Sequence, residues 1–315
     1  MPVSVPISST TRIGLIAGFE AYDHLAETVG LLDELAFDSL WVGDHVAFTS
    51  PILDPMIQLA QAASLSARLT IGTAIYLLPL RPPAVAAKQA ATLDHLSGGR
   101  FVFGVGVGGE FPTEYEACGI PVSERGARLT ESIDVMRLLW RGEPCSFEGH
   151  FTTFHDVHMQ PPALTPGGPA IWCGGRSQAA LSRIGRTADG WISYVVTPEQ
   201  YRAGLATIGK AADSVGRKLQ RLGTGHVQFV RMGATREAAL DAASAILSKR
   251  YAMDFRRATE RYCALGSSAD VLAQLQQFHA AGVRTFILDF LGTPAEQALQ
   301  LKQFGAEVLP EMRAF

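Results

Sequence analysis

Asp44 and His45 stand next to each other directly after residues 39–43, a short apolar run that predicts a buried strand. A histidine near a carboxylate at a strand end can donate or accept a proton, or can polarise a carbonyl group. The alternative is that the aspartate caps a turn and that the histidine packs under a loop. The two residues alone leave both interpretations open.

A second cluster is the sequence IWCGGRSQAALSRIG, in which a predicted strand leads into Gly174 and Gly175 and then into a helix with Arg176 and Ser177 in its first turn. The free N–H groups of a helix start, the helix dipole and a nearby cation together bind anions. The alternative is an ordinary turn in which the serine caps the helix. We favour a phosphate site, because phosphate sites recur in such loops of α/β barrels.

A third cluster is the glycine run GVGVGG at residues 104–109, which ends another predicted strand. Glycines at a strand end allow a close approach to the backbone. The pattern GxGxxG is met at Gly104, Gly106 and Gly109, but a dinucleotide site needs this motif to open a helix. Because EFPTEYEACGIP follows instead, we reject a nicotinamide site here.

Three histidines, His150, His155 and His158, could suggest a metal site. They lie within residues 141–169, a stretch rich in Gly, Pro and aromatic residues that has no helical period. A structural hairpin explains this pattern better, and we predict no metal.

The elements that must position these clusters alternate regularly along the chain. Short apolar runs are separated by helical stripes, such as Leu129, Ile133, Met136 and Trp140. Strands with helices between them predict a parallel sheet, and eight such units can close into a (β/α)8 TIM barrel. An open doubly wound sheet is the alternative. The predicted strands are residues 12–18, 39–43, 69–75, 100–107, 170–173, 190–194, 225–231 and 283–289.

In such a barrel the active site lies at the carboxyl ends of the strands. The residues just past these ends are rich in glycine and in groups that bind ligands. They are Phe19, Asp44, His45, residues 74–77 from Ala74 to Leu77, residues 106–110 from Gly106 to Glu110, residues 174–177, Tyr194 and Asp289.

Two stretches interrupt the alternation. Residues 141–169 predict a short hairpin and an extended loop, and residues 248–267 are charged and look helical, as an insertion before the last βα unit. Neither has the composition of a linker, so we expect residues 1–315 to form a single domain with two insertions.

Composition limits the class of protein. The chain has 27 Lys+Arg and 30 Asp+Glu, a net charge of −3, so no basic excess points to nucleic acid. No apolar run approaches the ~20 residues of a membrane span, and the start of the sequence lacks the features of a signal peptide. The four cysteines form no CxxC pair, which suits reduced thiols. We expect a cytoplasmic protein whose partner is a small-molecule substrate.

The sequence resembles the bacterial luciferase-like flavin and deazaflavin oxidoreductases over nearly its whole length. The matching segments are SLWVGDH, LTIGTAIYLLPLRPPAVAAKQAATLDHLSGGRFVFGVGVG, LTESIDVMRLLW, FEGHFTTF and IWCGGRSQAALSRIGRTADGW. The resemblance implies a TIM barrel that binds a flavin-type ring inside its mouth, and it implies a homodimer.

The resemblance also assigns roles to individual residues. Asp44 would hydrogen-bond the deazaflavin ring, and His45 would transfer a proton or polarise the substrate. Ala74–Ile75 would fall at a strand bulge where members often have a non-prolyl cis peptide bond under the ring. The other residues that we expect at the cofactor are Leu77 and Gly108, together with Gly174, Gly175, Arg176 and Ser177 of the phosphate turn.

The Asp-His pair resembles the coenzyme F420 branch of the family rather than the FMN monooxygenase branch. The F420-dependent sugar-phosphate dehydrogenases carry Glu directly after GxGxG and Trp four residues after the His. Here Gly109 and Thr49 occupy those places, with Glu110 one residue further on, which argues against a sugar phosphate.

We therefore expect an F420-dependent oxidoreductase that moves a hydride between the deazaflavin and a small organic substrate, with His45 and Glu110 as catalytic residues. One alternative is an FMN-dependent monooxygenase that uses reduced flavin and oxygen. The other is a flavin-binding protein without turnover, because a fold does not fix a function.

Overall fold

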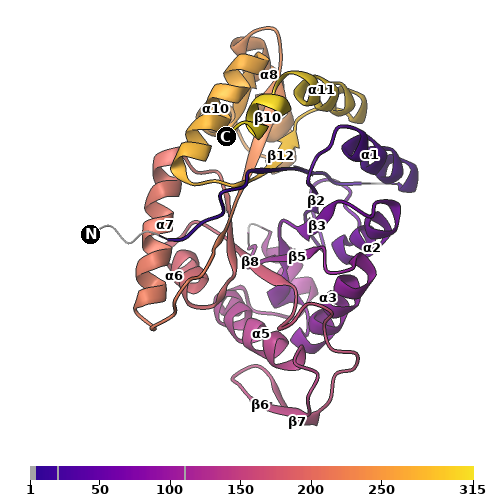
Figure 1. Ribbon diagram of the computed structural model, residues 1–315, viewed down its shortest axis with the longest axis vertical. Helices are drawn as coiled ribbons and strands as arrows, with labels where there is room; N and C mark the ends of the chain where they lie inside the picture. Colours follow the sequence, from indigo (N-terminus) through magenta and orange to yellow (C-terminus); the bar gives the residue numbers. More distant parts are fainter. Residues whose placement is uncertain (1–4, 20, 110) are drawn as a thin grey trace.

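A computed structural model describes residues 5–19, 21–109 and 111–315, and within them eight parallel strands close into a barrel (Figure 1). The ring closes because β1 pairs with β2 on one side and with β12 on the other. All eight predicted strands and the TIM-barrel class are confirmed. Around the ring, the strands are β1 (Arg12–Ile16), β2 (Ser39–Val42), β3 (Thr70–Thr73), β5 (Phe101–Gly106), β8 (Ala170–Gly174), β9 (Gly190–Tyr194), β10 (Gly223–Met232) and β12 (Thr285–Phe290).

Helices follow the strands and cover the outside of the barrel (Figure 1). Helix α3 shows how local sequence sets their limits. It begins at a proline, which needs no N–H partner in the first turn, and it ends at Gly98, whose φ of 64° lies in the left-handed region. The main helices are α1 (Tyr22–Glu34), α2 (Pro55–Leu65), α3 (Pro83–Ser97), α5 (Arg125–Leu139), α6 (Gln178–Thr187), α7 (Pro198–Asp213), α8 (Arg236–Tyr251), α10 (Ser268–Ala281) and α11 (Pro294–Glu307).

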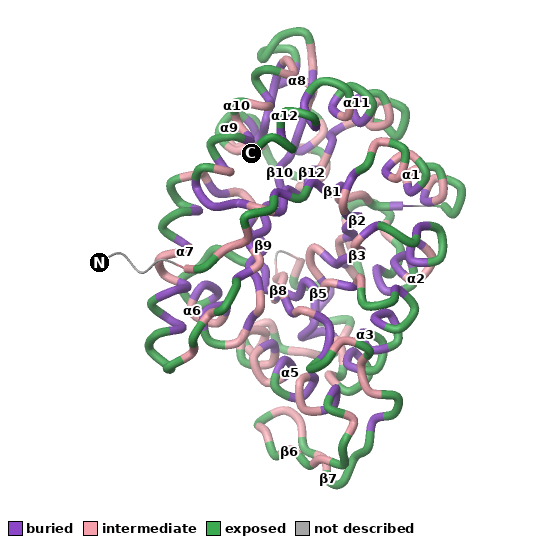
Figure 2. The backbone as a smooth tube through the Cα atoms, viewed as in Figure 1, coloured by how far each residue is buried: buried purple, intermediate pink, exposed green. Residues whose placement is uncertain are grey.

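Large side chains fill the barrel interior. The rings of Trp41 and Trp172 lie 5.8 Å apart, and both belong to a cluster that is separate from the larger core between the strands and the helices. Each indole needs a glycine opposite it, because a Cβ at Gly72 would lie 2.4 Å from Trp41 and one at Gly190 would lie 2.5 Å from Trp172. Figure 2 shows the buried residues along the strands and the inner helix faces. The barrel is thus a packed core.

The two stretches that interrupt the predicted alternation of strands and helices have regular structure of their own. Residues 141–169 contain an antiparallel hairpin, β6 (Cys145–Glu148) and β7 (Thr153–Val157), which projects beyond α5 (Figure 1). Residues 248–267 contain the end of α8, the short helix α9 (Arg256–Tyr262) and a strand, β11 (Ala264–Gly266), that pairs with β10. The sequence did not predict this strand, because three residues are too few for a periodic pattern. Among the described helices, none has the length and apolar character needed to cross a bilayer.

Short elements complete the mouth of the barrel. Strand β4 (Tyr76–Leu77) continues the line of β3 and pairs with β5, and the 3-10 helix η1 (Leu78–Leu80) follows it. Helix α4 (Pro112–Ala117) and the 3-10 helix η2 (Val122–Glu124) lie between β5 and α5, and α12 (Leu309–Arg313) closes the chain. Of the side chains described below, that of Leu77 comes from β4 and that of Glu114 from α4.

A buried histidine makes the stability of the fold depend on pH. His226 in β10 stacks on Phe278, with 4.1 Å between ring centroids, and shares a hydrogen bond of 2.7 Å with the Ser193 hydroxyl. Burial lowers the pKa of His226 to about 3. The unfolded chain, with a histidine pKa of about 6.5, therefore binds a proton between pH 6.5 and 3 that the folded chain excludes.

We predict that this residue contributes its full stability above pH 6.5, and that this contribution falls by about 1.4 kcal/mol for each pH unit below it. Urea unfolding at pH 7.5 and pH 5.5 measures the effect. His226→Asn, which keeps a polar atom near Ser193, should reduce the difference between the two pH values by about 1 kcal/mol. The surface substitution His95→Asn serves as the control. An unreduced difference in folded His226→Asn would exclude His226 as the titrating group.

Candidate active site

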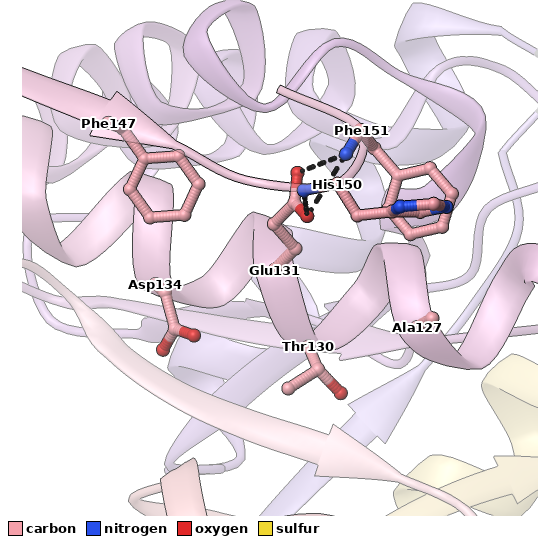
Figure 3. Close-up of a pocket in the computed structure, with 7 residues that line it drawn as sticks. All are labelled: Ala127, Thr130, Glu131, Asp134, Phe147, His150 and Phe151. Atoms are coloured by element: carbon pink, nitrogen blue, oxygen red, sulfur yellow. Dashed lines mark hydrogen bonds between the residues drawn. The ribbon is translucent and has the colours of Figure 1, made fainter. Parts of the chain in front are cut away.

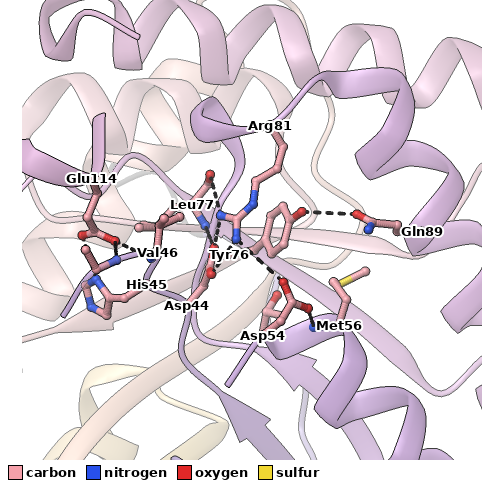
Figure 4. A network of polar contacts seen from close by, with 12 residues as sticks. Asp44, His45, Val46, Asp54, Met56, Tyr76, Leu77, Arg81, Gln89 and Glu114 are labelled. Carbon is pink, nitrogen blue, oxygen red and sulfur yellow. Dashed lines mark hydrogen bonds and ion pairs between the residues drawn. The ribbon is translucent and has the colours of Figure 1, made fainter. Parts of the chain in front are cut away.

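Asp44 lies two residues after the end of β2 and is buried, and its carboxylate joins two segments of the mouth (Figure 4). One oxygen, Oδ1, accepts from Nη2 of Arg81 at 2.8 Å, and the other accepts from the backbone N–H of Leu77 at 2.8 Å and from Nη1 of Arg81. Asp44 does not cap a helix, since Asp54 caps α2. Its contact with the deazaflavin ring stays a prediction. An ionised carboxylate has about four acceptor positions, and the hydrogen bonds from described residues use three of them.

Burial and pairing act in opposite directions on this ion pair. Burial raises the pKa of the Asp44 carboxyl, while the hydrogen bond and charge of Arg81 and the Leu77 N–H counteract it. Burial alone would lower the pKa of Arg81, but its bond to Asp44 and the charge of Asp44 outweigh burial and raise it. Burial is the largest effect on Asp44 and raises its pKa overall, so the bidentate bonds to Arg81 are what favour the charged form of this carboxyl.

His45 is held on three sides. Its Nδ1 lies 2.9 Å from Oε1 of Glu114, its ring stacks on Phe48 with 4.0 Å between centroids, and Phe111 meets it edge-on at 5.5 Å. The side chain is 22% exposed, whereas that of Glu114 is 2% exposed. The second oxygen of Glu114 accepts from the backbone N–H of Val46 at 2.6 Å (Figure 4). The histidine thus has a fixed orientation and access to the mouth.

The peptide bond between Ala74 and Ile75 is cis, as the resemblance implied. The Ile75 side chain packs where two neighbouring strands lack side chains, because a Cβ at Gly106 would lie 1.8 Å from its Cδ1 and one at Gly174 would lie 2.9 Å from its Cγ2. A Cβ at Gly108 would likewise lie 2.7 Å from Leu77. The space beside these glycines is therefore filled, at least in part, by the side chains of Ile75 and Leu77.

The turn before α6 has features of both a serine-capped helix start and a phosphate site, the two interpretations made from its sequence. Ser177 is the N-cap, and its hydroxyl oxygen accepts from the N–H of Ala180 at 3.2 Å. The first intrahelical bond runs from the N–H of Leu181 to the carbonyl oxygen of Ser177, so the N–H groups of the three residues between precede it, and the cap binds that of Ala180. Gly175 has a φ of 126°, which excludes most side chains. Arg176 donates to the carbonyl oxygen of Val195 at 3.0 Å. The cap leaves the serine hydroxyl hydrogen available to an anion.

Two further arginines stand at the mouth. A Cβ at Gly109 would lie 3.0 Å from Nε of Arg125, the first residue of α5. On the opposite side, Arg250 of α8 pairs with Asp289 of β12 at 2.6 Å, and its carbonyl oxygen accepts from the Thr49 hydroxyl at 2.6 Å. The charge of Asp289 raises the pKa of Arg250. The loop after β2 and the second insertion therefore meet across the mouth.

A hollow of about 520 Å³ lies away from the mouth, between α5 and the hairpin (Figure 3). Glu131 accepts there from the backbone N–H groups of His150 and Phe151 and fixes the hairpin to the helix. Among the described residues, no three His, Cys, Asp or Glu side chains gather as a metal site requires. The hollow is lined by Ala127, Thr130, Glu131, Asp134, Phe147, His150 and Phe151.

The structure thus brings His45 and Asp44 into defined networks, but it pairs them with partners that the sequence analysis missed. Glu110, our second catalytic candidate, lies outside the described residues. Glu114, the carboxylate that contacts His45, stands four positions later in EFPTEYE, and only the density of acidic residues there could have drawn attention to it. Arg81 follows Leu77 by four positions and carried no signal of its own.

The sequence profile of the luciferase-like monooxygenase family matches residues 1–308. The chain therefore belongs to this family, which agrees with the barrel and with the site at its mouth.

Relatives in this family include monooxygenases and reductases. The chain is 32% identical over 222 residues to the 4-hydroxyprotoasukamycin monooxygenase of Streptomyces nodosus subsp. asukaensis, covering 67% of this chain and 59% of that protein. It is 28% identical over 263 residues to the phthiodiolone/phenolphthiodiolone dimycocerosates ketoreductase of Mycobacterium tuberculosis, covering 80% and 68%. The chain is also 33% identical over 167 residues to an uncharacterized protein of Mycobacterium tuberculosis. That match covers 53% of this chain and 57% of that protein.

Solved structures share the fold at low sequence identity. An F420-dependent secondary alcohol dehydrogenase in complex with an F420-acetone adduct has a TM-score of 0.84 at 18% identity, over 96% of this chain and 99% of that chain. The oxygenating constituent of 3,6-diketocamphane monooxygenase from Pseudomonas putida, in complex with FMN, has a TM-score of 0.74 at 18% identity over 96% and 99%. Neighbours of this fold therefore hold either F420 or FMN.

The Asp44–Arg81 pair generates a first prediction about the site. Arg81→Met should lower the free energy of unfolding by about 3–5 kcal/mol, because it leaves a buried carboxylate without its partner. Arg256→Met breaks two exposed ion pairs, with Glu237 and Asp241, in which Arg256 is 48% exposed, and should cost no more than about 1 kcal/mol. Urea unfolding at pH 7 compares the two. A loss below 1 kcal/mol for Arg81→Met would show that the pair does not support the mouth.

Proposed function

We propose that the protein is an F420-dependent oxidoreductase that moves a hydride between the deazaflavin and a small organic substrate. The observation that carries this proposal is His45, a partly exposed histidine at the carboxyl end of β2 whose ring is fixed by Glu114 and Phe48. A fixed proton donor and acceptor is what hydride transfer to and from a carbon–oxygen bond requires. The F420-dependent alcohol dehydrogenase of the same fold is consistent with this chemistry.

The mouth offers a surface that suits a flat ring. Ala74 and Ile75 present an apolar wall that belongs to the interior cluster, and the hydrogen bond that the N–H of Leu77 donates to Asp44 fixes the segment after this wall. We assign Ala74, Ile75 and Leu77 to the support of the ring. The deazaflavin, when bound there, supplies the site that takes up or gives back a hydride.

The turn before α6 suits the phosphate of either cofactor. The first N–H groups of α6, the hydroxyl of Ser177 and the glycine backbone at Gly175 are anion donors of the kind that helix N-termini provide. Arg125 at the start of α5 adds a cation near Gly109. These features favour a phosphorylated flavin or deazaflavin, and they do not distinguish F420 from FMN.

His45 supports the choice of F420. Removal of a hydride from an alcohol requires a base for the hydroxyl proton, and reduction of a ketone requires the matching acid. A histidine can serve both directions near neutral pH. Phe48 and Phe111, which pack against the ring, exclude water from two of its sides. These residues would thus hold and move the proton while the cofactor takes the hydride.

An FMN-dependent monooxygenase is the second candidate, favoured by the 32% identity to a monooxygenase and by the FMN-bound structure of the same fold. A flavin-binding protein without turnover is less well supported, because the buried Glu114 holds His45 in a way that binding alone does not require. Cofactor choice therefore decides between the two enzymes.

We predict that purified protein binds F420 more tightly than FMN, as measured by quenching of cofactor fluorescence. His45→Ala should retain the cofactor affinity and lose hydride transfer to ketones or from secondary alcohols by about 10²–10⁴-fold. Micromolar binding of FMN without detectable binding of F420 would overturn the assignment in favour of the monooxygenase.

A second prediction concerns the phosphate turn. Ser177→Gly removes the hydroxyl donor at a cost of only a few tenths of a kcal/mol in helix stability, and it should weaken cofactor binding about 10-fold or more. The matched control is Thr235→Gly, which removes the same kind of cap from α8 and should leave cofactor binding unchanged. Equal affinities for the two variants would place the phosphate elsewhere.

A further inference from the structure

We propose that Glu114 sets the tautomer of His45, so that Nδ1 carries the ring proton and Nε2 is the atom that exchanges a proton with the substrate. This inference rests on the proposed function for the role of His45, but the tautomer itself does not depend on which cofactor binds. Glu114 would be a positioning residue, since it acts through the histidine.

The contacts of Glu114 define which atoms can donate. Its Oε1 lies 2.9 Å from Nδ1 of His45, and its Oε2 accepts from the N–H of Val46 at 2.6 Å and of Ala47 at 3.3 Å. An ionised carboxylate can only accept hydrogen bonds. Because the backbone donors occupy one oxygen and the histidine faces the other, Nδ1 must be the donor, as it is when a carboxylate orients a catalytic histidine.

The same contacts leave Nε2 free to act. In the part of the chain that the structure describes, His45 has one hydrogen bond, at Nδ1, and its ring is held by Phe48 and Phe111. A neutral ring with Nδ1 protonated has its lone pair on Nε2. When a secondary alcohol is oxidised, the hydroxyl proton would pass to Nε2 and the hydride to the deazaflavin, which leaves a ketone and a histidinium ion that Glu114 stabilises. Reduction would reverse each transfer.

Glu114→Gln tests this assignment because an amide has one acceptor oxygen where the carboxylate has two. The oxygen can keep the two backbone donors, Val46 and Ala47, only if the amide NH₂ faces His45. Nδ1 must then accept, the ring proton moves to Nε2, and the histidine can no longer act as the base. Glu131→Gln is the matched control, since Glu131 also accepts from two backbone N–H groups, but at the hairpin.

The measurement is the ¹⁵N NMR spectrum of histidine-labelled full-length protein at pH 8, with the His45 signals assigned by their loss in His45→Ala. We expect the Nδ1-protonated tautomer in the unaltered protein and in Glu131→Gln, and the Nε2-protonated tautomer in Glu114→Gln. Alcohol oxidation with F420 should fall by about 10²-fold or more in Glu114→Gln, with cofactor affinity unchanged and no loss in Glu131→Gln.

An Nε2-protonated His45 in the unaltered protein would overturn the proposal, even if Glu114→Gln did not fold. An unchanged tautomer in folded Glu114→Gln would overturn the proposal as well. So would a changed tautomer in this variant together with a rate of alcohol oxidation within threefold of that of the unaltered protein. If the tautomers behave as expected but F420 supports no turnover in any form, the proposed function fails while the assignment of the proton to Nδ1 stands.

Discussion

The buried carboxylate of Asp44 is the interaction on which the mouth of this barrel depends. It accepts from the Leu77 backbone and from both terminal nitrogens of Arg81, and so it joins the end of β2 to the segment after β3. A charge in so buried a position persists only while its partners are in place. The same segment carries Ile75, two residues before Leu77, whose side chain packs beside Gly106 and Gly174, so the carboxylate of Asp44 holds the stretch of backbone that forms this wall.

The glycines at the strand ends have two uses in this structure. Their spacing first indicated that a ligand approaches the backbone, and the structure shows that Ile75 and Leu77 occupy the space beside Gly106, Gly108 and Gly174. A side chain at any of these three positions would meet Ile75 or Leu77, so each glycine is needed for the packing of this wall.

The opposite side of the mouth is built from the second insertion. Arg250 pairs with Asp289 at the end of β12, and the Thr49 hydroxyl bonds to the Arg250 carbonyl. The loop that carries His45 and Phe48 is therefore attached to an element about 200 residues later in the chain. This contact limits the freedom of the loop, and the ion pair with Asp289 holds the same residue, Arg250, to the barrel.

The sequence by itself determined the eight strands and the barrel, because hydrophobic periodicity is a local signal. Its resemblance to the family also implied the cis bond between Ala74 and Ile75, because the matching segment is continuous there. It also placed His45 at a strand end. Only the tertiary structure decided the partners, since the contacts from His45 to Glu114 and from Asp44 to Arg81 join residues 69 and 37 positions apart. Their positions in the sequence do not predict these contacts, because the closure of the barrel and the path of α4 bring the residues together.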